Sequence, residues 1–157
     1  MFISNTCVST IATIVAWLLM STATGKAVAK QWKGMIPGTT TKSQVIDKFG
    51  APTKEFSKGG KLSDGIRYEG EEAIEGALQA DFFFDIDEKL FRMDIIPARE
   101  LTRAQVVGVY GKQYLEGTTK KGLKYIKYTD KGLTIFFEPD SDKVMIFLFT
   151  RGTSSQK

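Results

Sequence analysis

The chain carries the same ten-residue pattern twice. Residues 41–50 and 102–111, which begin 61 positions apart (102 − 41), both read T-[KR]-[SA]-Q-V-[IV]-x-x-[FY]-G. Four shorter matches occur in the same order along the chain, namely 35–37 with 95–97, 66–68 with 126–128, 83–85 with 136–138, and 89–90 with 143–144. Ordered self-similarity of this kind is typical of a duplicated structural unit. The sequence therefore predicts two copies of one small unit, with shorter loops in the second copy.

Each copy of the pattern predicts a short helix with defined ends. A threonine followed three residues later by glutamine forms a capping box, which satisfies free backbone N–H groups at a helix start. The valine and the aromatic residue, four positions apart, share one helical face, and the final glycine suits a C-terminal cap. The positions are Thr41, Gln44, Val45, Phe49 and Gly50, with Pro52 after them, and then Thr102, Gln105, Val106, Tyr110 and Gly111.

Runs of alternating apolar and polar residues after each helix predict antiparallel strands. The runs cover residues 65–70, 78–86 and 89–96 in the first copy, and 123–129, 132–138 and 143–150 in the second. Asp87-Glu88 and Asp130-Lys131-Gly132 lie between runs and are typical of hairpin turns. The expected fold class is α+β, with two tandem α-β-β-β repeats and an antiparallel sheet whose helices pack on one face.

A helix that reads G-x-T-x-x-x-V and ends in F-G-x-P before an antiparallel meander resembles the BamE/SmpA family. The motif is carried by Gly38, Thr41, Val45, Phe49, Gly50 and Pro52. The tandem arrangement is similar to the β-lactamase inhibitory proteins (BLIP-like), which have two such units. These resemblances cover residues 34–150 and imply a protein-binding role in the bacterial cell envelope, such as outer membrane assembly or inhibition.

The sequence departs from both families. The second copy reads Gly111-Lys112-Gln113 and lacks the proline. BamE is a single-unit lipoprotein, whereas this chain has two matching units and no cysteine at the expected cleavage position. The inhibitors carry disulfides, and this chain has a single cysteine, Cys7. The resemblance therefore implies a fold and a compartment and does not identify the partner.

The first 29 residues have the pattern of an export signal. Residues 8–20 form a largely apolar run that is shorter than the roughly 20 residues a membrane-spanning helix needs. Ala27-Val28-Ala29 is typical of a cleavage site and places the mature N-terminus at Lys30. Because residues 1–7 carry no Lys or Arg, an N-terminal membrane anchor is the alternative. The expected organisation is a signal peptide at 1–29, a first repeat at 30–94, a second repeat at 95–150 and a flexible tail at 151–157, in a periplasmic or secreted protein.

The composition excludes most familiar catalytic chemistry. The chain has no histidine and one cysteine, which removes histidine acid–base catalysis, cysteine nucleophiles and Cys/His zinc sites. We therefore expect no enzymatic activity, no cofactor and no metal site. The 22 basic and 18 acidic residues are scattered, for a net charge of +4, so no nucleic-acid partner is expected.

Strand alternation predicts which residues face the helices. In the first copy these are Ile66, Tyr68, Phe82, Phe84, Ile86, Phe91, Met93 and Ile95, and the opposite set is Arg67, Glu69, Asp81, Phe83, Asp85, Leu90, Arg92 and Asp94. The equivalent opposite face of the second copy holds five large apolar residues, Tyr125, Phe136, Val144, Ile146 and Leu148. Such a group is either an exposed binding surface or is covered by another part of the chain.

The sequence thus predicts a non-enzymatic, exported protein-binding module that binds a protein partner through its sheet face. The alternative is a carrier of an apolar small molecule or lipid in a groove on that face. Trp32 either anchors the N-terminal segment to the sheet or inserts into a partner. The acidic stretch from Glu69 to Glu75 is expected to form a surface loop.

Overall fold

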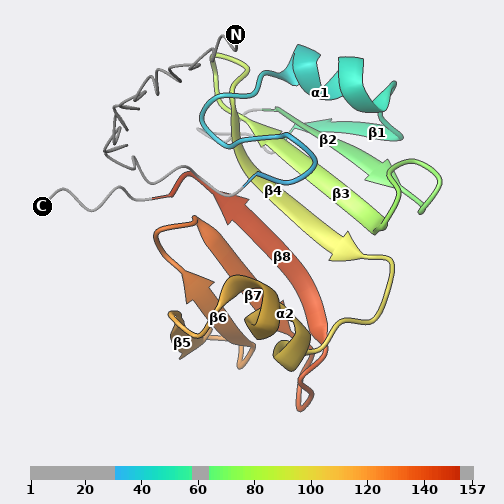
Figure 1. Cartoon of the computed structure of the whole chain (residues 1–157). Coiled ribbons are helices and arrows are strands. Elements are labelled where there is room, and N and C mark those ends of the chain that lie inside the picture. Colours follow the sequence, from blue (N-terminus) through green and yellow to red (C-terminus); the bar gives the residue numbers. More distant parts are fainter. Residues whose placement is uncertain (1–30, 58–63, 153–157) are drawn as a thin grey trace, which may run out of the picture.

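The computed structural model describes residues 31–57 and 64–152, so the export signal, its cleavage position and nearly all of the expected tail lie outside the described residues. Figure 1 shows an antiparallel sheet with two short helices. The helices are α1 (Lys42–Phe49) and α2 (Arg103–Tyr110), and the strands are β1 (Lys54–Ser57), β2 (Asp64–Glu69), β3 (Ala77–Phe84), β4 (Leu90–Pro97), β5 (Leu115–Thr118), β6 (Lys124–Tyr128), β7 (Leu133–Phe137) and β8 (Val144–Thr150). Neither helix in this part of the chain is long and apolar enough to cross a membrane.

The eight strands form one sheet in the order β1-β2-β3-β4-β8-β7-β6-β5. Each half is a meander of successive neighbours, and the two halves meet where β4 pairs with β8 (Figure 1). Four residue pairs join these central strands, from Arg92↔Thr150 to Ile95↔Phe147. The sheet is therefore continuous across the chain, and the boundary expected at residue 95 falls inside β4.

Both helices begin at capping boxes. The Thr41 hydroxyl accepts a hydrogen bond from the Gln44 backbone N–H, and the Gln44 side chain accepts one from the Thr41 N–H at 3.0 Å. Thr102 and Gln105 make the same reciprocal pair at the start of α2. Each helix has eight residues, a length that is marginal in water without tertiary packing. The caps set where the helices start, and contact with the sheet must supply most of their stability.

Both helices pack on the same face of the sheet. The Phe49 ring at the end of α1 lies 5.9 Å from the Tyr68 ring, and the Tyr110 ring at the end of α2 lies 5.7 Å from the Tyr128 ring. Strand register places Tyr68 and Tyr128 on one side of the sheet. Tyr68 lies two positions after Ile66 on β2 and so faces the same side, and a row of directly paired residues runs across the sheet from Ile66 to Tyr128. This row is Ile66, Phe82, Met93, Phe149, Leu133 and Tyr128. The row is the centre of the core, and each of its members is buried.

Both halves differ from expectation in their number of strands. The six expected strands are present within one or two residues of their predicted ends, but β1 and β5 were not predicted. β1 pairs with β2 and β5 pairs with β6, so each helix is followed by four strands. The predicted α-β-β-β order is therefore wrong by one strand in each half.

A β-bulge between β3 and β4 makes part of the predicted facing in the first half wrong. The pairing of β3 with β4 shifts between Phe83 and Phe84, which places Leu90 opposite Phe84. A bulge adds one residue to one strand and so reverses the alternation beyond it. Leu90 is consequently fully buried on the helix side, whereas Phe91 contacts Phe83 on the opposite side. The expectation for Ile86 is also wrong, because it lies in the turn before β4 and is 90% exposed.

Candidate protein-binding face of the sheet

The side of the sheet away from α1 and α2 is called the open face. Its middle row can be followed from strand to strand through the register, and runs Lys54, Arg67, Asp81, Asp94, Leu148, Thr134 and Lys127. The row is charged over β1 to β4 and mostly uncharged over β7 and β8. This row is therefore charged throughout the first half, and in the second half it holds Leu148, Thr134 and Lys127.

Two arginine–aspartate pairs lie at the centre of the open face. Arg67 donates two hydrogen bonds to Asp81, at 2.7 and 2.8 Å, and Arg92 donates two to Asp94, at 2.6 and 2.5 Å. The two aspartates are direct cross-strand neighbours and are only 6% and 8% exposed. Bidentate pairing compensates their charges and fixes both guanidinium planes. The hydrogen bond to Asp81 raises the pKa of Arg67 above its ordinary value.

An aromatic group adjoins these pairs on the first half. The Phe83 ring lies 5.6 Å from Phe56 and 6.3 Å from Phe91, and the Arg92 guanidinium stacks 5.2 Å from the Phe83 centroid. Phe56 lies over its cross-strand partner Gly65, where an added Cβ would come within 2.4 Å of the ring. The glycine thus makes room for the aromatic ring on the open face.

The second half carries the predicted apolar group, with one correction. The Tyr125 and Phe136 rings are 5.6 Å apart, and Ile146 is the cross-strand partner of Phe136. These three residues and Leu148 are partly exposed on the open face, and together they are called the open-face patch. The neighbouring residue Ile135, on the helix side, is fully buried.

Val144 does not belong to this patch. A second bulge, between Phe136 and Phe137, pairs Val144 with Phe137. The valine side chain is therefore 6% exposed and part of the core. Met145 follows it and lines a hollow of about 310 Å³ beside the patch, together with Leu78 and Ile96. Leu78 is 55% exposed. Leu78 and Met145 were missed because the bulges on β3 and β8 change the alternation on which the prediction relied.

Asp85 has a structural role in the turn that follows β3. Asp85 accepts backbone hydrogen bonds from Asp87 and Lys89 at 3.0 and 2.9 Å, which closes the turn between β3 and β4. Within residues 31–57 and 64–152, no three acidic or cysteine side chains come together in a way that could hold a metal ion.

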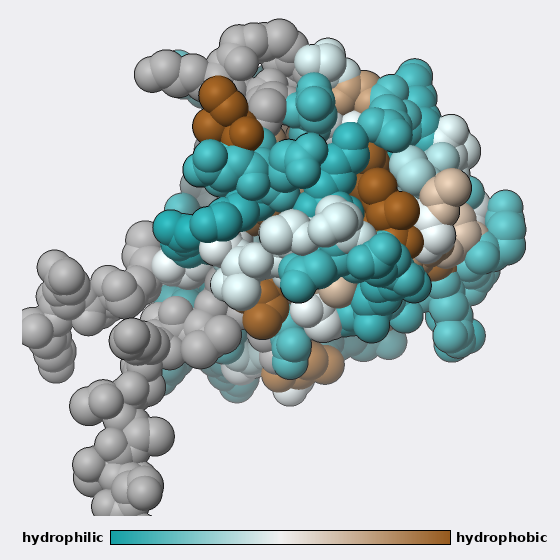
Figure 2. All heavy atoms as spheres, turned by 90° about the horizontal axis from the view of Figure 1, so that it is seen from above, coloured by the Kyte–Doolittle hydropathy of each residue, from teal (hydrophilic) through white to brown (hydrophobic). Residues whose placement is uncertain are grey.

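Figure 2 shows hydrophobic patches that interrupt an otherwise largely hydrophilic surface at the α1 end of the molecule.

The fold belongs to the α+β class, and consists mostly of one antiparallel eight-stranded sheet. No family model and no curated protein matches the sequence. Among solved structures, the chain is similar to a DUF4309 family protein (YjgB) from Bacillus subtilis subsp. subtilis str. 168, with a TM-score of 0.56 and 12% identity over 80% of this chain and 88% of that chain. At this identity the likeness shows a shared fold alone.

Proposed function

We propose that the protein is a non-enzymatic, exported protein-binding module of the bacterial cell envelope, and that its partner binds the open face. The observation that carries the proposal is the open-face patch, which has the fixed Arg92–Asp94 pair on the neighbouring strand β4 and the Arg67–Asp81 pair farther along the same face. Tyrosine, phenylalanine and arginine are enriched at the centres of protein interfaces, where rigid aromatic side chains contribute most of the binding energy. The role agrees with that implied by the resemblance to BamE/SmpA and the β-lactamase inhibitory proteins.

We further propose that the two halves are tandem copies of one unit. Equivalent contacts support this. Tyr68 donates a hydrogen bond to the Gly50 carbonyl and Tyr128 donates one to the Gly111 carbonyl, both at 2.8 Å. The first residue of each helix also forms an ion pair with the strand that follows, Lys42 with Glu55 and Arg103 with Glu116. Both members of the second pair lie 61 positions after those of the first (103 − 42 and 116 − 55).

Paired substitutions on the two sides of β7 test whether the open-face patch is a surface. We expect Phe136→Asp to change the free energy of unfolding by about 1 kcal/mol, because the side chain is already partly in water. Its neighbour Ile135 is fully buried, so Ile135→Asp should cost about 4 kcal/mol or more. Urea unfolding measures both values. Equal losses for the two variants would show that Phe136 is ordinary core and would remove the proposed surface.

Site-specific photo-crosslinking in cells tests partner binding. A benzophenone side chain at position 146, on the open face, should yield a defined crosslinked protein partner. The matched control is position 109 on α2, where Val109 is 76% exposed and lies on the other side of the sheet. We expect no defined product from position 109, and Phe136→Asp should weaken the product from position 146. The same product from both positions would contradict binding through the open face.

A further inference from the structure

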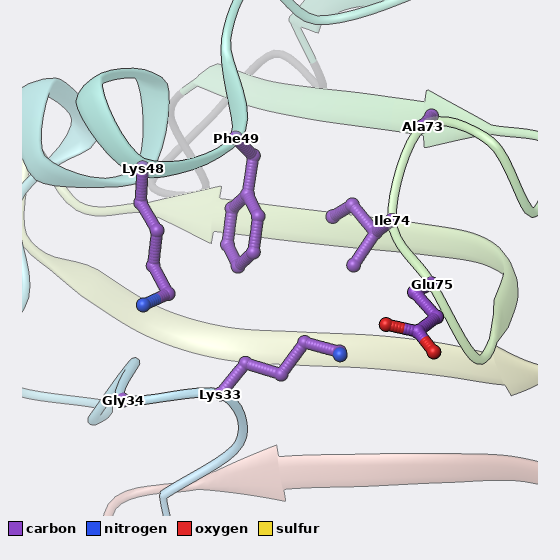
Figure 3. A pocket seen from close by; sticks show the side chains of 7 residues that line it. All are labelled: Lys33, Gly34, Lys48, Phe49, Ala73, Ile74 and Glu75. Carbon is purple, nitrogen blue, oxygen red and sulfur yellow. The ribbon is translucent and has the colours of Figure 1, made fainter.

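A hollow of about 590 Å³ lies on the helix side of the first half, away from the open face. It is bounded by the end of α1, the loop between β2 and β3, and the turn formed by residues 32–35 (Figure 3). Its lining residues are Lys33, Gly34, Lys48, Phe49, Ala73, Ile74 and Glu75. Small-molecule sites are typically of this volume and combine an apolar floor with a few polar groups.

The turn that presents Lys33 has an unusual backbone. Trp32 and Met35 exchange two backbone hydrogen bonds, at 3.1 and 2.9 Å, around Lys33 and Gly34, whose φ angles are +49° and +84°. A two-residue turn with both φ angles positive favours Asn-Gly or Gly-Gly. A lysine in the left-handed region costs about 1 kcal/mol. Backbone strain of this kind occurs at functional sites, and here it holds a lysine at the edge of a hollow.

The turn is anchored firmly to the core. The Trp32 ring lies 6.2 Å from both Phe49 and Phe82, so the tryptophan anchors this segment to the helix side of the sheet. Met35 is 7% exposed and belongs to the core. The position of Lys33 is therefore fixed by packing on both sides of the turn.

Lys48 points into the same hollow from the last turn of α1 (Figure 3). Its Nζ lies 3.8 Å from the place that a Cβ on Gly34 would occupy, which puts the ammonium directly beside the strained turn. Neither Lys33 nor Lys48 forms an ion pair within residues 31–57 and 64–152, although Glu75 lines the opposite side of the hollow. Two lysines and one glutamate therefore line a shared space, and no described carboxylate forms an ion pair with either lysine.

The floor of the hollow is apolar. Phe49 is partly buried, Ile74 is 4% exposed, and Ala73 lies beside it. In Figure 3 the Phe49 ring and the Ile74 side chain face the space between Lys48 and Glu75, and the Lys33 side chain extends below them toward the Glu75 carboxylate. The arrangement combines two cations, one carboxylate and a hydrocarbon surface around one hollow.

The second half lacks the parts that build this hollow. Seven residues connect β2 with β3 (70–76), whereas four connect β6 with β7 (129–132). The position on α2 that corresponds to Lys48 is Val109 (48 + 61), which is 76% exposed. An eight-residue helix in this setting therefore does not require a cation there, and Lys48 in α1 lies in the last helical turn with its Nζ 5.9 Å from the centroid of the Phe49 ring.

We propose that this hollow binds a small amphipathic anion, with a phosphate or carboxylate head between Lys33 and Lys48 and an apolar body along Phe49 and Ile74. Two ammonium groups favour a negative head, and the buried hydrocarbon adds affinity in proportion to the chain length that contacts it. The site differs from the open face in position and in ligand, so the two can be occupied independently.

Calorimetric titration of the full chain with octyl phosphate tests the proposal, with octanoate, inorganic phosphate and octanol as comparison ligands. We expect saturable one-to-one binding of octyl phosphate, and at least tenfold weaker binding of inorganic phosphate and of octanol. The relative affinity of octanoate tells whether the natural head is a phosphate or a carboxylate. Lys48→Gln should lower octyl phosphate affinity at least tenfold, while Lys112→Gln, at an exposed position after α2 and outside the hollow, should leave it unchanged.

Lys33→Asn provides the most specific test. Asparagine suits the first position of this turn better than lysine, so the variant should melt at a higher temperature than the parent chain. It should nevertheless bind octyl phosphate at least tenfold more weakly, because it removes one of the two cations. The proposal is overturned if Lys33→Asn and Lys48→Gln both keep octyl phosphate affinity within twofold of the parent. Equal affinity for inorganic phosphate, or no saturable binding of octyl phosphate, overturns it as well.

Discussion

Tyr68 and Tyr128 tie the ends of the two helices to the sheet. Each ring is at most 2% exposed, and each hydroxyl donates a hydrogen bond to the carbonyl of the glycine that ends a helix. Helix ends leave carbonyl groups without intrahelical partners, so this bond satisfies one of them. Tyrosine is suited to the task because its ring fills the core while its hydroxyl reaches the helix end.

Because these tyrosines are buried, we expect the protein to lose stability at alkaline pH. Burial raises the pKa of Tyr68, Tyr110 and Tyr128 above the ordinary value of 10.0. In the unfolded chain they ionise near pH 10, whereas in the folded chain they keep their protons to higher pH. Above about pH 10 the unfolded state therefore binds fewer protons, and the free energy of unfolding falls as pH rises.

Urea unfolding between pH 8 and pH 11 measures this fall. Compared with the parent chain, the double variant Tyr68→Phe/Tyr128→Phe should start about 2 kcal/mol less stable at pH 8, because it lacks two hydrogen bonds worth about 1 kcal/mol each. Its stability should then decline less steeply above pH 10. An unchanged slope would mean that other groups cause the alkaline loss.

At the scale of elements, the capping boxes fix the starts of α1 and α2. Thr41→Ala and Thr102→Ala should each lower the free energy of unfolding by about 1 kcal/mol, because each removes a side-chain acceptor from the first turn. The two losses should add, since the caps lie in separate halves. Thr39→Ala, at an exposed position before the cap, is the control and should change stability by less than about 0.5 kcal/mol. If the double variant loses no more free energy of unfolding than one of the single variants, the losses do not add.

The helices and six strands could be predicted from sequence because their signals are local. Capping residues and alternating apolar positions define them without reference to the rest of the chain. β1 and β5 could not be predicted in the same way, since each is four residues long with one large apolar side chain, Phe56 or Leu115. Their strand conformation comes from pairing with β2 and β6. For many short edge strands, pairing with a neighbouring strand determines whether the segment is a strand at all.

The candidate site was predicted in part for a related reason. Tyr125, Phe136, Ile146 and Leu148 lie on the open face as strict alternation requires. Val144 does not, because the bulge beside Phe137 reverses the alternation at that point. A bulge leaves little trace in a single sequence. A prediction of which side of the sheet a residue faces is therefore reversed for residues that follow an unrecognised bulge. The hollow beside Lys33 was not predicted, since its parts are distant in sequence and meet only in the folded chain.

At the scale of the whole molecule, the pairing of β4 with β8 makes one core from two halves. Met93 on β4 is the direct partner of Phe149 on β8, and their exposed fractions are 0% and 3%. Met93 also pairs with Phe82 in the first half, and Phe149 pairs with Leu133 in the second. Apolar contact therefore continues across the junction without a polar layer, and the halves should unfold as one cooperative unit.

Substitution at the junction tests this cooperativity. Phe149→Ala should cost about 3–5 kcal/mol, because it leaves a cavity in the centre of the shared core. If the halves unfold together, amide hydrogen exchange should accelerate to the same extent in the most protected peptides of β2 and β3 as in those of β6 and β7. Leu115→Ala, on edge strand β5 where the leucine is 64% exposed, is the control and should leave exchange in both halves nearly unchanged. Faster exchange confined to β6 and β7 would show instead that the halves are separate folding units joined only by backbone pairing.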